Sequence, residues 1–109
     1  MLTFDMYQAE AMRTANPNTD EGAKLINAVL GLAGESGEVA DHVKKFLYQG
    51  HELDIEKLIK EAGDILWYIA LLSQALGRNM DYIAQENIMK LRKRYPDGFS
   101  TEKSINRNE

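Results

Sequence analysis

The chain has 109 residues, a length that suits one domain with a thin core, and its formal net charge at pH 7 is −4. It has no cysteine, which excludes disulfides, thiolate zinc sites and cysteine nucleophiles, and two histidines do not suit a histidine-rich metal site. The acidic balance argues against non-specific binding of nucleic acid, which needs a basic surface. Any chemistry must therefore use oxygen ligands, amines and guanidinium groups.

The first ten residues carry acids and polar groups where a signal peptide needs a basic start followed by an apolar stretch. No run in the chain approaches the roughly 18 apolar residues of a membrane span. The sequence therefore predicts a cytoplasmic protein.

Capping residues mark out the first two predicted helices. The first runs from about Thr3, a suitable N-cap, to about Ala15, where a turn-forming Asn-Pro-Asn follows. The second begins after Asp20 and continues to about Tyr48, just before Gly50.

The third and fourth helices have equally clear ends. The third starts after Asp54, a good N-cap, and closes at Gly77, a typical glycine just beyond a helix. The fourth spans about Met80 to Tyr95, and Pro96 ends it.

No strand-like alternation or hairpin signal interrupts these helices. The sequence therefore predicts an all-α, four-helix-bundle-like domain over residues 1–100, with a polar, flexible tail over 101–109. The second helix also carries a seven-residue apolar pattern. Its members are Leu25, Val29, Leu32, Ser36, Val39, Val43 and Phe46. Because short bundles often complete their burial by oligomerising, we expect this seam to serve core packing and self-association.

Two pairs of carboxylates stand out on the second and third helices. At about 100° per residue, Glu35 and Glu38 lie about 60° apart, and so do Glu61 and Asp64. Glu61 also lies nearly in line with Leu72, inside the buried stripe of its helix. A carboxylate in an apolar setting is costly unless a cation or hydrogen bonds satisfy it. Facing each other on antiparallel helices, the two pairs would make an oxygen-only site for Mg²⁺ or Mn²⁺.

Ordinary salt bridges are the alternative for these four acids. Lys57 and Lys60 lie near Glu61 in the sequence, and Glu38 could pair with Lys45. Against this, glycines cluster beside the acids, at a cost of about 1 kcal/mol each within a helix. They suggest close backbone approach or room for a ligand, and the spacing alone leaves both interpretations open.

The fourth helix carries a basic stripe. Asn87, Lys90 and Arg94 fall within about 60° of one another, so they could grip successive phosphates. The alternative is a cationic helix end that complements its own dipole.

Four segments together resemble the MazG-like all-α nucleoside-triphosphate pyrophosphohydrolases, and the likeness is greatest to small single-domain members from bacteria and phages. An acidic ExxE followed by ExxD defines that family, and it matches the two carboxylate pairs. The matching segments are Gly31-Leu-Ala-Gly-Glu-Ser-Gly-Glu-Val39, Lys60-Glu-Ala-Gly-Asp-Ile-Leu-Trp-Tyr68, Asn87-Ile-Met-Lys-Leu91 and Arg94-Tyr-Pro-Asp-Gly-Phe99. One departure is Gly34, which stands where the family often has a further acid, and it leaves the number of bound ions open.

The resemblance implies Mg²⁺-dependent hydrolysis of nucleoside triphosphates between the α- and β-phosphates. All four carboxylates would then be metal ligands, with Glu38 also taking a proton from water. Lys90 and Arg94 would stabilise charge on the phosphates, on the same chain or on a neighbour, since relatives form homodimers or homotetramers. Asn87 would hold sugar or phosphate.

Contacts to the rest of the nucleotide are expected from residues elsewhere in the chain. Gln8 would touch the base, and Tyr95 would contact the substrate from the turn after the basic stripe. Trp67 is predicted to stack on the base, with Tyr48 and Tyr68 as further candidates.

Three competing functions remain. Phosphoribosyl-ATP pyrophosphohydrolase shares the fold and the chemistry, and a non-catalytic helical interaction module would use the acids only as salt bridges. A di-iron carboxylate bundle fits poorly, because such sites expect Glu-x-x-His and Glu38 is followed three residues on by Asp41.

Overall fold

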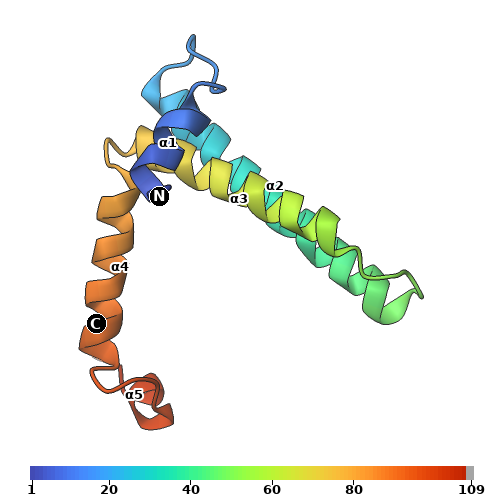
Figure 1. The fold of residues 1–109 in the computed structure, drawn as a ribbon, viewed down its shortest axis with the longest axis vertical. Coiled ribbons are helices and arrows are strands. Elements are labelled where there is room, and N and C mark those ends of the chain that lie inside the picture. Colours follow the sequence, from blue (N-terminus) through green and yellow to red (C-terminus); the bar gives the residue numbers. More distant parts are fainter. Residues whose placement is uncertain (108–109) are drawn as a thin grey trace.

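The computed structural model describes residues 1–107, which form helices joined by short turns, so the all-α class is confirmed (Figure 1). In this part of the chain no helix is long and apolar enough to cross a membrane. The five helices are α1 (Phe4–Met12), α2 (Glu21–Tyr48), α3 (Ile55–Ala75), α4 (Met80–Arg94) and α5 (Thr101–Ile105).

Side-chain caps fix where the helices start. Thr3, Asp20, Asp54 and Asn79 each accept a hydrogen bond from a backbone N–H three residues on. The helix bounds therefore lie close to those predicted. One difference is at the end of α1, which stops at Met12 and not near residue 15. There the backbone tightens into turns bonded three residues apart.

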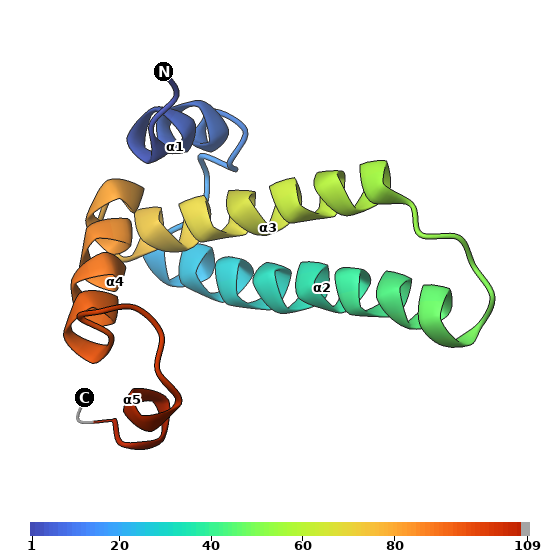
Figure 2. The ribbon, with the colours of Figure 1, turned by 60° about the horizontal axis from the view of Figure 1, so that its bottom comes forward.

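The long helices α2 and α3 form an antiparallel hairpin and make the most extensive contact in the molecule (Figure 2). The ring of Tyr68 on α3 packs tightly against the backbone of Gly31 on α2. A Cβ added at Gly31 would come within 2.1 Å of Cε1 of that ring. The glycine is therefore required for this packing, which sets the two helices face to face.

The short helix α1 lies across α3 and the start of α4. A small core of Ala11, Ala70 and Met80 joins the three helices. The Nε1–H of Trp67 donates to the carbonyl oxygen of Ala11 at 3.1 Å and to Oγ1 of Thr14 at 2.8 Å. These bonds fix α1 on α3.

In contrast, α4 turns away from the hairpin, so the helices of one chain do not close into a bundle (Figure 1). The radius of gyration is 17.1 Å, whereas a compact domain of this length has about 13 Å. The accessible surface is 8166 Å², against about 6,100 Å² for a compact monomer of this mass. The excess of about 2,000 Å² is consistent with a chain that completes its core against another chain.

Part of the polar tail is helical. Ser100 caps α5 by accepting from the N–H of Lys103, which explains why a short helix forms where a flexible tail was predicted. Residues 108 and 109 of that tail lie outside the described part of the chain.

Replacing Gly31 with Ala should test the hairpin contact. The added methyl group collides with the Tyr68 ring, and we expect a net loss of about 1–2 kcal/mol in the free energy of unfolding. The control is Gly63→Ala, on the open side of α3, where no atom lies within 4 Å of the new Cβ. Helix propensity should make that variant about 0.5–1 kcal/mol more stable. Urea denaturation measures both, and an equal gain in both variants would contradict the close approach.

Candidate functional site

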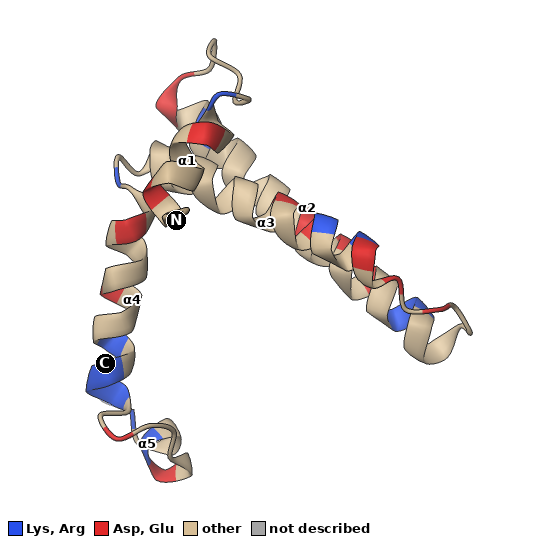
Figure 3. Ribbon diagram, in the orientation of Figure 1, with Lys and Arg blue, Asp and Glu red and all other residues tan. Residues whose placement is uncertain are grey.

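The packing of α2 against α3 brings the two predicted carboxylate pairs together. Glu35 is half-buried on α2, and its pKa is raised by burial and by the negative charges of Asp64, Glu38 and Glu61. All three neighbours therefore lie within electrostatic reach of Glu35. Figure 3 shows the acidic residues midway along the hairpin.

Glu61 occupies the least solvated position of the four. Its side chain is 8% exposed, as its place in the apolar stripe predicted. Within the described residues, its Oε2 is buried and has no hydrogen-bond partner. A lone carboxylate oxygen in that state costs stability unless something outside the chain satisfies it.

Salt bridges do not account for these acids. Among residues 1–107, none of the four carboxylates forms an ion pair. Nζ of Lys45 lies 2.9 Å from Asp41 and Nζ of Lys44 lies 3.7 Å from it, whereas Lys57 and Lys60 form no ion pair in the described part of the chain. Lys45 still attracts Glu38 through space, but within residues 1–107 the four acids have no contact ion pair to offset their like charges.

These residues fit a hard divalent cation by their chemistry. All the donors are carboxylate oxygens, the ligand type that Mg²⁺ and Mn²⁺ prefer, and the orphaned oxygen of Glu61 is free to ligate. The side chains do not yet converge, however. No three His, Cys, Asp or Glu side chains in the described part of the chain form a ready-made ligand cluster. Binding would require rotamer changes at the exposed acids Glu38 and Asp64.

A polar pocket of about 380 Å³ adjoins this site at the end of the hairpin where the loop joins α2 to α3, and the sequence did not predict it. Glu38 belongs to both the pocket and the carboxylate group. Nε2 of His42 accepts a hydrogen bond from the N–H of Asp54 at 3.0 Å, which ties the end of α2 to the start of α3. Lys57 also lines the pocket and offers a cation. This pocket forms because the end of α2 and the start of α3 lie side by side.

Tyr7 is another neighbour of the site that sequence reasoning missed. It lies half-buried on α1, and its pKa is raised by burial and by the charge of Asp64. Its phenol therefore lies within electrostatic reach of the Asp64 carboxylate.

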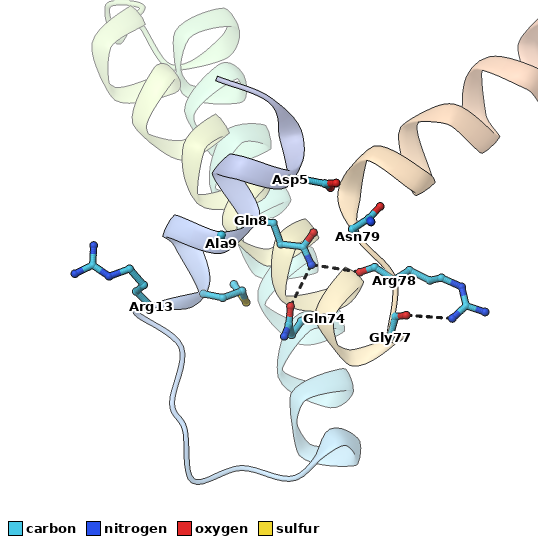
Figure 4. A pocket seen from close by; sticks show the side chains of 9 residues that line it. Asp5, Gln8, Ala9, Arg13, Gln74, Gly77, Arg78 and Asn79 are labelled. Atoms are coloured by element: carbon cyan, nitrogen blue, oxygen red, sulfur yellow. Dashed lines mark hydrogen bonds between the residues drawn. The ribbon is translucent and has the colours of Figure 1, made fainter. Parts of the chain in front are cut away.

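The structure gives Gln8 a structural role. Its side chain is 7% exposed, and its Nε2 donates to Oε1 of Gln74 and to the carbonyl oxygen of Arg78. Its Oε1 accepts from the N–H of Met80 at 2.7 Å. Gln8 thus holds α1 to the turn between α3 and α4, beside a pocket of about 650 Å³ that Arg13 also lines (Figure 4).

The aromatic candidates for base stacking differ in availability. The indole of Trp67 is bonded to α1 and meets the Tyr68 ring edge-on, with centroids 5.0 Å apart. Tyr68 is committed to the contact with Gly31. Tyr48 is 80% exposed at the end of α2 and is free to stack.

The basic stripe of α4 lies far from the carboxylates of its own chain. Figure 3 shows the cations at the end of α4 and the acids along the hairpin. Asn87 lines an apolar groove of about 400 Å³ in the angle between α3 and α4. Lys90 is exposed, and Arg94 is half-buried with its guanidinium carbon 5.9 Å from the ring centroid of Tyr95. The structure thus does not bring the stripe and the acids together within one chain.

The turn after α4 folds against α5. The ring centroids of Tyr95 and Phe99 lie 5.6 Å apart. Gly98 has a φ of +91°, a backbone conformation that favours glycine. A hydrogen bond with Ser104 and the nearby cations of Arg107 and Arg94 lower the pKa of Tyr95. Tyr95 thus faces α5 and supports the end of the basic stripe.

Comparison with known proteins identifies the family. Residues 24–99 match the MazG nucleotide pyrophosphohydrolase domain. The chain belongs to the MazG family. It is also 32% identical over 105 residues to the Gene 37 protein of Mycobacterium phage L5, covering 89% of this chain and 92% of that protein. No solved structure gives a significant match.

The MazG match covers nearly all of α2 and the whole of α3 and α4, so it includes all four carboxylates and the basic stripe. It thereby confirms the resemblance seen in the sequence and supports nucleotide pyrophosphohydrolase activity at the level of the family. It starts after α1, so it does not cover Tyr7 and Gln8.

Replacing Glu61 with Gln should reveal the cost of its buried charge. In EDTA we expect the variant to be more stable than wild type by about 1 kcal/mol, or roughly 4 °C in melting temperature. Mg²⁺ should raise the melting temperature of wild type but not that of the variant. Glu86→Gln, an exposed site on α4, is the control and should keep the Mg²⁺ response. A Glu61→Gln variant that still responds to Mg²⁺ like wild type would contradict a role for Glu61 in binding.

Proposed function

We propose that this MazG domain hydrolyses ribo- or deoxyribonucleoside triphosphates between the α- and β-phosphates, giving a nucleoside monophosphate and pyrophosphate. The observation that carries the proposal is the buried Oε2 of Glu61, which has no partner among residues 1–107, beside three further carboxylates without ion pairs in that part of the chain. A chain keeps such repulsion where a bound cation offsets it. Family membership supplies the nucleotide as the substrate class.

In this proposal Glu35, Glu38, Glu61 and Asp64 hold Mg²⁺, with Mn²⁺ as a substitute. When bound, the ion would neutralise charge on the phosphate oxygens. Glu61 is the most fixed of the four because it is buried, whereas Glu38 and Asp64 are exposed and adjust their rotamers.

Glu38 is our choice for the general base. It is exposed and lines the polar pocket, so its carboxylate can reach a water molecule there. It would take the proton as the water oxygen attacks phosphorus and the α–β anhydride bond breaks. Protonation of Glu38 would also relieve its repulsion with Glu35.

Negative charge on the released phosphates must be stabilised by cations. We assign this role to Lys90 and Arg94 of a neighbouring chain in a homodimer or homotetramer. The stripe lies too far along α4 to serve its own hairpin (Figure 3). Asn87, which belongs to this stripe, and Tyr95, which directly follows it, would contact sugar and phosphate. Trp67 would contribute a ring edge to the base, while Gln8 would act indirectly by holding α1 in place.

Activity assays on carboxylate variants test this assignment. We expect wild type to release pyrophosphate from at least one member of a panel of nucleoside triphosphates and deoxynucleoside triphosphates in Mg²⁺. Glu61→Ala and Asp64→Ala should each lower kcat/KM by at least about 100-fold, and Glu38→Gln should lower kcat by about 10²–10⁴-fold. Glu86→Gln should match wild type.

Two outcomes would favour other functions. Activity confined to phosphoribosyl-ATP would identify the related hydrolase of histidine synthesis. Absence of any hydrolysis, together with no Mg²⁺-induced change in melting temperature, would favour a non-catalytic interaction module. Full activity in Glu61→Ala or Asp64→Ala would overturn the metal assignment.

Subunit complementation tests whether the cations act on a neighbour. Glu61→Ala and Arg94→Ala chains should each be inactive alone, but coexpression should restore about a quarter of wild-type activity, because half of randomly mixed dimers hold one intact site of two. Coexpressed Glu61→Ala and Asp64→Ala chains should stay inactive, since both lesions fall in the carboxylate half. No rescue in the first mixture would show that the stripe does not act across chains.

A further inference from the structure

Side chains of α1 cap the first turn of α4. The first backbone N–H groups of a helix have no partner inside that helix. In α4, the N–H of Met80 donates to Oε1 of Gln8 at 2.7 Å, and the N–H of Asp81 donates to Oδ1 of Asp5 at 3.0 Å. The local cap Asn79 accepts only from the next residue along. Figure 4 shows Asp5 pointing from α1 toward the start of α4. The start of α4 is therefore held in place by α1.

One of these contacts brings two carboxyl groups together. Asp5 and Asp81, which we call the carboxyl pair, are both half-buried. The pKa of Asp81 is raised by burial, by the charge of Asp5 and by a side-chain hydrogen bond with Asp5, although backbone hydrogen bonds at Asp5 and Phe4 oppose the rise. Two carboxyl groups hydrogen-bond to each other only when one of them carries a proton, and they repel when both are ionised.

The surroundings of the carboxyl pair do not neutralise it. Among residues 1–107, neither member of the pair forms an ion pair. Arg13 is paired with Glu10. Arg78 donates to the carbonyl oxygen of its neighbour Gly77. The titratable groups other than the pair that line the two adjoining pockets are Arg13, Arg78, Tyr7 and the α-amino group of Met1. Helix α3 contributes only uncharged side chains to these pockets, so the proton on the pair decides how strongly its members attract or repel.

Beyond its first turn, α4 has room to change direction. An apolar groove of about 400 Å³ lies between α3 and the next turns of α4. On the α4 side it is lined by Ile83, Ala84, Asn87 and Ile88. Arg94 lies about 20 Å along the helix axis from Asp81, so a tilt of about 10° at the first turn moves Arg94 by about 3–4 Å. A small change at the carboxyl pair is therefore amplified at the far end of α4.

We propose that the carboxyl pair is a proton-dependent clamp that sets the direction of α4. With one proton on the pair, the O–H of Asp81 donates to Asp5 while Asp5 still accepts from the N–H of Asp81, so two hydrogen bonds join α4 to α1. With both groups ionised, only the N–H bond remains and repulsion opposes it. The clamp therefore holds α4 at acid pH and loosens as the pH rises.

Thermodynamic linkage gives the same direction. The folded chain binds the proton of Asp81 more tightly than the unfolded chain does, because the pKa of Asp81 is raised on folding. Protonation therefore stabilises the fold as the pH falls through the raised pKa, and this contribution is lost as the pH rises through it. The clamp itself does not depend on the hydrolase function. Its effect on the phosphate-binding stripe of α4 rests on the proposed function.

Spin labels measure the direction of α4 without any assay of hydrolysis. The chain has no native cysteine, so labels on Gln49→Cys at the end of α2 and on Arg92→Cys of α4 report one distance within the chain. An excess of unlabelled chain removes distances between copies. Double electron–electron resonance should give a broad distance distribution at about pH 8 that narrows at about pH 4.5, with a shift in the mean of about 3–4 Å.

Matched variants separate the clamp from other acids. In Asp81→Asn the side-chain amide donates to Asp5 at every pH, so the distribution should be narrow and independent of pH. Asp5→Ala removes the acceptor, so the distribution should be broad at both pH values. Glu86→Gln removes an exposed acid elsewhere on α4 and should respond to pH like wild type. Circular dichroism checks that all three variants remain helical.

Three results would overturn the clamp. They are a wild-type distribution that does not change with pH, an Asp81→Asn variant that still responds to pH like wild type, and a narrow distribution in Asp5→Ala. Thermal melting adds a second measurement: Asp81→Asn should melt a few degrees above wild type at about pH 8, and the difference should disappear at about pH 4.5. A difference that does not change with pH would also contradict the clamp. None of these results bears on hydrolysis, which the carboxylate variants of α2 and α3 test separately.

Discussion

The ring of Tyr68 lies directly on the backbone of Gly31, and the rest of the site depends on this contact. It draws α2 and α3 close enough for acids on both helices to share one electrostatic environment, as the raised pKa of Glu35 shows. A side chain at position 31 would separate the helices or displace the ring. The glycine thus gives up some helix stability for a geometry that brings four carboxylates together.

Repulsion among the carboxylates lowers the stability of a fold whose core is small. Few apolar side chains are fully buried, and α1 is held by the buried amide of Gln8 and the indole of Trp67 as much as by packing. Such a chain tolerates uncompensated charge poorly on its own. A cation bound to these acids would return stability to the folded state.

The sequence was a good guide to local structure. Capping residues such as Asp20 and Asp54 placed the helix starts, and the apolar period placed Glu61 in the buried stripe, because both depend on neighbours within a few residues. The direction of α4, the role of Gln8 and the polar pocket beside Glu38 were not predicted. Each depends on contacts between residues far apart in the chain, and no local pattern reports them.

The departure at Gly34 now has a structural context. No atom lies within 4 Å of a Cβ built there, so an acid would fit without strain. Its absence removes one carboxylate from a site already rich in like charges, and it does not reflect a packing requirement.

We propose that oxygen ligands from α2 and α3 support cleavage of the bond between the α- and β-phosphates. Phosphorus NMR of a nucleoside triphosphate incubated with the protein and Mg²⁺ follows both products directly. Our account predicts resonances of nucleoside monophosphate and pyrophosphate in equal amounts, which EDTA prevents from forming. Formation of nucleoside diphosphate and orthophosphate would contradict it.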